Sequence, residues 1–202
     1  YNAIGSTFWS QAEIYDLIYF AEMDLADRAH VIEQTYSTTT VASTQEYSFP
    51  TNAIGVKRIS WYGVPLKKIE FKEDDIITAN NTATTSSGDP RYYYIWNRTI
   101  SLRPIPSSAQ TLKLWTYDQP GTLTAVSTLD VPLKYHPDIV DYVVGKMVVK
   151  DEKYDLSKWY LDRWEIAVKN AMKSKQKEKR NDSFAYVKDE ASLLDTTVIG
   201  FI

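Results

Sequence analysis

The side chains most often used in catalysis are too widely spaced in this chain to form a recognisable catalytic or metal site. The only two histidines, His30 and His136, are far apart, and neither has a second ligand at metal-binding spacing. Adjacent carboxylates such as Asp151-Glu152 point in different directions and make no acid–base pair by themselves. There is no cysteine, and the seven glycines form no phosphate-binding loop or nucleophile elbow. We therefore expect no enzyme, no cofactor and no metal site.

A short basic run, KSKQKEKR at residues 173–180, is the charged segment best suited to binding. Its cations could contact DNA or an acidic partner, but at a helix C-terminus they would also complement the helix dipole and stay solvated. The formal net charge of −3 argues against a protein that grips nucleic acid through its phosphates. The candidate partner-binding residues of this run are Lys173, Lys175, Lys177, Lys179 and Arg180.

Residues 181–202 are predicted to form an extended C-terminal arm. The segment cannot bury much surface by itself, yet it carries aromatic and aliphatic side chains. A strand-forming apolar end without a local partner is either the last strand of the chain's own sheet or an arm that pairs with another subunit. Its candidate contact residues, to a partner protein or a neighbouring subunit, are Phe184, Tyr186, Leu193, Leu194, Val198, Ile199, Phe201 and Ile202.

Two loops are further candidates for contact with a partner. Residues 80–89 are rich in Thr, Ser and Asn, and form either a contact finger or a plain connection. Two strand-like runs, 91–96 and 99–102, are joined by Asn97-Arg98, which predicts a hairpin even though Arg tolerates positive φ poorly. The candidate contact residues are Thr82, Thr84, Thr85, Asn97 and Arg98.

Three helices must position these segments. The sequence Ser10-Gln11-Ala12-Glu13 fits a capping box, which predicts a helix to about residue 32. Pro137 starts a second helix, and Asp155 caps a third after a short break that makes these two antiparallel neighbours. We expect a three-helix bundle formed by residues 1–35 and 133–180.

Between these helices, residues 36–132 predict an inserted antiparallel β-sheet or sandwich, because Thr, Tyr, Val and Ile alternate there with Gly and Pro turns. The expected fold class is therefore α+β. The chain has six Trp and fifteen Tyr. Trp61, Trp96 and Trp115, with Tyr92 to Tyr94, suggest an alternative function: a β-sandwich that binds carbohydrate or a surface through exposed rings.

The overall composition is that of a globular protein. At 202 residues and 44% hydrophobic, the chain can bury one core, or one core and a smaller satellite. No apolar stretch approaches the roughly 20 residues needed to span a bilayer, so we expect no membrane partner.

An ordered series of motifs resembles the head-to-tail adaptor, or connector, proteins of tailed bacteriophages, including those similar to tail tubular protein A. The series covers residues 8 to about 175. It comprises QEYSFP at 45–50, VKRI at 56–59, GVPL at 63–66, GDPRYYYI at 88–95, ISLRPIP at 100–106, and VPLKYHP at 131–137.

The resemblance implies a structural virion protein, assembled in the host cytoplasm and located at the head–tail interface. It implies a ring, usually of twelve copies, docked under the portal and carrying the tail or further ring proteins, with genomic DNA passing through its lumen. Acidic lumen residues would let DNA slide, a hypothesis motivated by the −3 charge that a lumen lined by Lys and Arg would refute. A tail or stopper ring that does not touch the portal is the alternative within this class.

Overall fold

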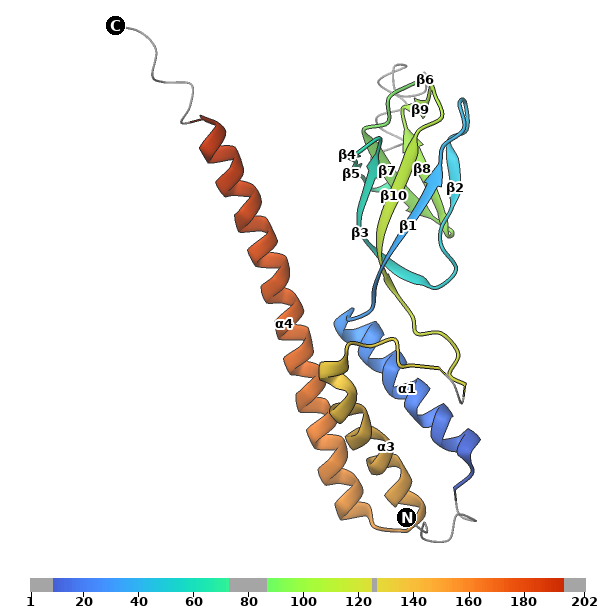
Figure 1. The fold of residues 1–202 in the computed structure, drawn as a ribbon, viewed down its shortest axis with the longest axis vertical. Coiled ribbons are helices and arrows are strands. Elements are labelled where there is room, and N and C mark those ends of the chain that lie inside the picture. Colours follow the sequence, from blue (N-terminus) through green and yellow to red (C-terminus); the bar gives the residue numbers. More distant parts are fainter. Residues whose placement is uncertain (1–8, 73–86, 125–126, 195–202) are drawn as a thin grey trace, which may run out of the picture. The chain divides into compact units, whose positions relative to one another are not determined.

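The computed structural model describes residues 9–72, 87–124 and 127–194 (Figure 1). The fold is mixed α+β, and the described residues form three α-helices and several sheets. The chain divides into two compact units, which we call the helical unit (Tyr1–Val31 and Thr122–Ile202) and the strand unit (Ile32–Gly121). Residues 122–132, which the sequence pattern assigns to the strand module, belong with the helices in this division.

Helix α1 (Gln11–Ala29) begins at the predicted capping box. The Glu13 amide donates to Ser10 Oγ at 3.2 Å, and the Ser10 amide donates to Glu13 Oε2 at 2.8 Å, so both orphan donors are satisfied and the prediction is confirmed. The helix ends earlier than expected. His30 adopts a left-handed conformation (φ 53°), and its amide closes the last turn on Ala26 O at 2.9 Å.

Two further helices complete the helical unit: α3 (His136–Lys150), preceded by the 3-10 helix η2 (Leu133–Tyr135), and α4 (Tyr154–Leu194). Helix α3 runs opposite to α4 (Figure 1), and α1 contacts both. At Gly145 an added Cβ would lie 3.0 Å from Leu161 Cγ and 3.2 Å from Tyr160 Cβ. A larger residue would therefore have to displace the Leu161 and Tyr160 side chains slightly, because α3 and α4 pack closely there.

Helix α4 corrects the expectation of an extended arm from residue 181. The backbone stays helical to Leu194, so the arm prediction is wrong as far as that residue. Residues 181–194 contain no Gly or Pro, and Ala, Glu, Lys and Leu favour continuation of a helix. An apolar end does not by itself indicate a strand when nothing in the preceding sequence ends the helix.

The strand unit holds two four-stranded sheets, ordered β1-β10-β3-β4 and β2-β8-β7-β5, and a small β6-β9 pair. Its strands are β1 (Glu33–Thr39), β2 (Glu46–Ser48), β3 (Ala53–Trp61), β4 (Val64–Pro65), β5 (Lys67–Lys68), β6 (Ser87–Gly88), β7 (Tyr92–Trp96), β8 (Thr99–Arg103), β9 (Ile105–Pro106) and β10 (Thr111–Asp118).

Most strand pairs are antiparallel as predicted, but β5 pairs with β7 and β6 with β9 in parallel. Long connections separate the members of each parallel pair, which gives the chain room to return in the same direction. Both four-stranded sheets contribute to one buried apolar cluster: Ile59, Trp61, Leu66, Tyr93, Ile100, Leu102, Leu112 and Leu114.

A buried carboxylate ties β1 to β10 in the strand unit. Asp118 is 3% exposed and accepts hydrogen bonds from the Tyr36 hydroxyl and, at 2.5 Å, from Thr116 Oγ1. The hydrogen bond to Asp118, with burial, raises the pKa of Tyr36 to about 12. The Asp118 amide also donates to Ile32 O at 3.0 Å, which fixes the start of the unit against its last strand.

A second buried carboxylate, Glu22 on α1, holds the segment that leads into α3. Glu22 is 1% exposed, and its Oε1 accepts from the amides of Asp130 (2.9 Å) and Val131 (3.3 Å). Burial raises the pKa of Glu22, and the two amide hydrogen bonds offset only part of this effect. The ionised form of this side chain is therefore disfavoured in the folded protein.

We expect Glu22→Gln to gain stability relative to the wild type as pH rises. Because the folded pKa is raised, the wild-type free energy of unfolding falls once pH exceeds the ordinary glutamate pKa, and the loss is complete above the raised value. Gln keeps the oxygen acceptor and removes this loss. Urea unfolding of both proteins from pH 3 to pH 8 measures the difference, and a constant gap across this range would contradict the prediction.

Glu13→Gln is the matched control. Its stability relative to the wild type should fall as pH rises, the opposite of the trend expected for Glu22→Gln. Hydrogen bonds from the Ser10 amide and from Lys150 lower the pKa of Glu13 to about 2. A lowered folded pKa adds stability as pH rises from about 2 to the ordinary glutamate range. The Gln variant should therefore fall behind the wild type over that interval.

Candidate interaction surfaces

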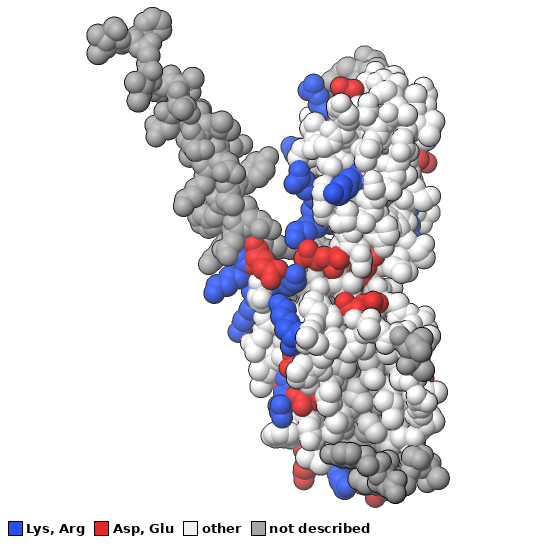
Figure 2. Space-filling model, in the orientation of Figure 1, with Lys and Arg blue, Asp and Glu red and all other residues white. Residues whose placement is uncertain are grey.

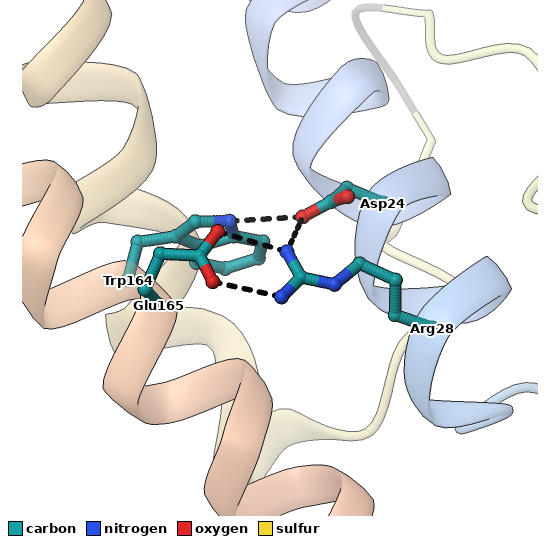
Figure 3. A network of polar contacts seen from close by, with 4 residues as sticks. All are labelled: Asp24, Arg28, Trp164 and Glu165. Carbon is teal, nitrogen blue, oxygen red and sulfur yellow. Dashed lines mark hydrogen bonds and ion pairs between the residues drawn. The ribbon is translucent and has the colours of Figure 1, made fainter.

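A polar network joins α1 to α4 (Figure 3). Arg28 donates to both oxygens of Glu165, from Nη1 to Oε1 at 2.9 Å and from Nη2 to Oε2 at 2.8 Å. Arg28 Nη1 also donates to Asp24 Oδ2 at 3.1 Å, and Trp164 Nε1 donates to the same oxygen at 3.0 Å. We call these four residues, Asp24, Arg28, Trp164 and Glu165, the Arg28 network.

The contact between Arg28 and Glu165 stabilises the charged forms of these two side chains. Hydrogen bonding to Glu165 raises the pKa of Arg28, and the same contact lowers the pKa of Glu165. The guanidinium fork matches two carboxylate oxygens at once, so the contact fixes direction as well as distance. The network therefore fixes the rotation of α4 relative to α1, and with it the face that each helix turns outward.

The outer face of α4 carries exposed apolar side chains. Trp159 is 52% exposed and Ile166 is 58% exposed, whereas Trp164, Val168 and Ala171 are buried. Leu156, another apolar residue of this helix, is 43% exposed. Apolar residues surround this part of the helix on more than one side, so periodicity alone could not separate the packed face from the exposed one.

The basic run continues this outer face of α4. Figure 2 shows Lys and Arg side chains gathered along the helix. Lys173 and Lys177 are exposed, while Lys175 forms an ion pair with Glu178 at 2.9 Å. Among the lysines of the run whose side chains are described, Lys173 and Lys177 are therefore the ones exposed to a partner.

The remaining C-terminal candidates have no described side-chain environment. One group belongs to the helical backbone of α4 and comprises Lys179, Arg180, Phe184, Tyr186, Leu193 and Leu194. The other lies outside the described residues and comprises Val198, Ile199, Phe201 and Ile202. Their partner-binding roles stay predictions.

The predicted hairpin at Asn97-Arg98 is confirmed, with β7 and β8 on either side. Both turn residues have positive φ, 44° and 56°, as a two-residue turn with matching twist requires. The Arg98 guanidinium donates to the carbonyl oxygens of Pro50 (2.5 Å) and Thr51 (2.7 Å) and lies 5.4 Å from the Phe49 ring centroid. These contacts offset the cost of Arg in a left-handed conformation, which explains how a turn with weak local chemistry forms.

The other loop candidates, Thr82, Thr84 and Thr85, lie outside the described residues. Asn97, in the hairpin turn, is exposed. The partner-contact role of Thr82, Thr84, Thr85, Asn97 and Arg98, on the tail side of an adaptor, stays a prediction.

Five of the six aromatic candidates in the strand unit are buried or half-buried. Trp61, Tyr93 and Tyr94 are 5%, 4% and 8% exposed. Trp115 is half-buried, with Arg58 Cζ at 5.1 Å and Lys113 Nζ at 4.9 Å from its ring centroid. Trp96 differs, because it is 63% exposed and stacks on Phe71 with ring centroids 5.2 Å apart. Glycan-binding surfaces need accessible rings, and of the six candidates Trp96 is the exposed one.

The described residues meet the requirements neither of a metal site nor of a membrane span. None of their His, Asp and Glu side chains gather in a group that could hold a metal ion. His136 Nε2 lies 3.0 Å from Val131 O and His30 Nδ1 lies 3.3 Å from Ala26 O, so both rings contact nearby backbone. Over the same described ranges, no helix combines the length and apolarity that crossing a bilayer requires.

We expect Arg28→Lys to lower the free energy of unfolding by about 1 kcal/mol, a figure reduced for the partial exposure of the pair. Lys keeps the charge but cannot donate to both oxygens of Glu165 in one plane. Arg163→Lys is the control, because Arg163 forms a one-point ion pair of 3.1 Å with Asp141 and lies 4.7 Å from the Trp159 ring centroid, at a half-exposed position. Chemical denaturation compares the two variants, and equal losses would contradict a special role for the bidentate contact.

Comparison with known proteins identifies the family. No curated protein matches the chain in sequence. The family model of the SU10 adaptor protein matches residues 2–188. The expected phage adaptor class is thereby confirmed, while the narrower likeness to tail tubular protein A stays a prediction. Because the match spans nearly the whole chain, the protein belongs to the SU10 adaptor protein family, a family of phage adaptor proteins.

Proposed function

We propose that this phage adaptor is a structural virion protein that forms a ring, docks under the portal, connects capsid to tail and leaves a channel for DNA. The observation that carries the proposal is the length of α4. Ala171 is the last buried side chain described on this helix, yet the helix continues to Leu194. At 1.5 Å per residue this stretch is about 35 Å long.

The described turns of α4 after Ala171, residues 172–178, carry no buried side chain. Isolated helices are marginal in water, and most helical stability in proteins comes from packing. A partner that covers this stretch in the assembled particle supplies the packing. The basic residues Lys173 and Lys177 lie where this stretch begins and are exposed.

The finer features of the proposal follow from the resemblance to head-to-tail adaptors, including those similar to tail tubular protein A. Usually twelve copies form such a ring, with the portal on one side and the tail or further ring proteins on the other. The three contacting helices then act as a bundle, and the two sheets as a sandwich that offers a second docking surface. DNA passes through the lumen without sequence-specific contacts.

Two alternative functions predict different oligomeric states and different binding partners. A tail or stopper ring would oligomerise without binding the portal. A carbohydrate-binding sandwich would stay monomeric and bind polysaccharide, but the burial of Trp61, Tyr93 and Tyr94 removes three of the six rings it would use.

Light scattering after size-exclusion chromatography, with and without the cognate portal, tests the proposal. We expect a stable complex of portal and adaptor with more than one adaptor copy. A ring that ignores the portal would favour the stopper alternative. A monomer that ignores the portal and binds polysaccharide would end the adaptor proposal.

A paired charge variant examines the basic run directly. We expect Lys173→Gln with Lys177→Gln to weaken portal binding by roughly tenfold, because two exposed cations at an interface each contribute modestly. Lys67→Gln with Lys68→Gln on β5 is the matched control, since it removes the same charge from two exposed positions. Equal affinity of both variants, measured by titration calorimetry, would argue against the run as a portal contact.

A further inference from the structure

We propose that neighbouring copies in the ring meet through the outer face of α1 on one copy and the outer face of α4 on the next. This inference rests on the proposed ring and names its lateral surfaces. The α1 outer face is defined by Asp16, Phe20, Met23 and Asp27. The α4 outer face is defined by Trp159, Asp162, Ile166, Lys169 and Lys173.

The α1 outer face is acidic around an apolar centre. Asp16 and Asp27 are exposed, and Phe20 between them is 53% exposed. With 3.6 residues per turn, these positions lie on one side of the helix. The opposite side is buried, with Ala21, Leu25 and Ala29 among its residues. An exposed Phe between two carboxylates is thus turned away from the unit's own core.

The α4 outer face is basic beside an apolar centre. Trp159, Ile166 and Lys173 follow one another at intervals of seven residues, which keeps them on one stripe of the helix. Lys169 and Lys173 are exposed. Asp162 lies on the same face and is offset by Lys158 four residues earlier, so the face keeps an excess of positive charge.

These two faces fit a second copy of this chain because each supplies what the other lacks. Phe20 can pack on Trp159 and Ile166, while Asp27, seven residues beyond Phe20, offers a carboxylate to Lys169 on one side of that apolar centre. Large aromatic side chains that are half exposed are the residue types that dominate interface energies when they become buried. Opposite charges around such a centre fix register and exclude contact between two like faces.

The two faces differ, so their contact is heterologous and has a direction. Repeated contacts of this kind close into a ring when the rotation between copies allows it. The Arg28 network holds α1 and α4 in a fixed orientation within each helical unit. The angle between the two outer faces is therefore the same in every copy, as closure requires.

A charge swap tests the pairing. We expect Asp27→Lys alone, or Lys169→Glu alone, to reduce the association constant between copies by roughly tenfold or more, because each places like charges opposite each other. The two changes combined in one chain should restore association. Lys67→Glu on β5 is the matched control for Lys169→Glu and should leave association unchanged. A combined variant no better than either single one would overturn the pairing.

Cross-linking tests whether the α1 outer face of one copy lies against the α4 outer face of another. The chain has no cysteine, so Met23→Cys and Asp162→Cys introduce unique sites on the two faces. We expect the chain with both changes, treated with a short bismaleimide, to give a ladder of covalent oligomers, and each single variant to give none. Dimers from a single variant would show like faces in contact and overturn the inference.

The outcomes separate this inference from the proposed function. Rings seen by light scattering without a ladder, and without sensitivity to the charge changes, would overturn the α1–α4 contact and leave the adaptor ring in place. A wild-type chain that stays monomeric, alone and with its portal, would overturn both.

Discussion

The bidentate contact between Arg28 and Glu165 is the constraint on which the helical unit depends. Interlocking apolar side chains already favour certain orientations of two packed helices. Two parallel hydrogen bonds, with Asp24 bridging Arg28 and Trp164, further restrict how α4 can rotate against α1. The choice of which α4 side chains are buried, and which remain exposed, follows from this fixed rotation.

In the strand unit, the directional hydrogen bonds are made by a buried carboxylate, Asp118. Asp118 accepts hydrogen bonds from two side chains, while its own amide donates to the backbone of Ile32. A buried carboxylate is costly unless its oxygens are satisfied, so the geometry that satisfies it is strongly preferred. Each unit thus combines an apolar core with directional polar contacts, Arg28–Glu165 and Glu22 in the helical unit and Asp118 in the strand unit.

Sequence patterns predicted the elements that local chemistry controls. The capping box at Ser10 and Glu13, the start of α3 near Pro137 and the hairpin at Asn97 were all recoverable, because their signals lie within a few residues. The parallel β5-β7 pair and the Arg28 network were not, because they depend on residues far apart in sequence. The continuation of α4 past residue 181 was missed because apolar end residues suggested a strand.

The exposed face of α4 shows why candidate surfaces were harder to predict than the fold. Leu156, Trp159 and Trp164 look alike in a hydrophobic pattern, yet only Trp164 is buried. The distinction arises from Trp164 donating to Asp24 on α1, a contact between two helices that no local pattern encodes. Once that contact fixes the rotation, Trp159 and Ile166 must point away from the core. Exposed apolar side chains that share one stripe of a helix, as Trp159 and Ile166 do, form the kind of patch that marks an interaction surface.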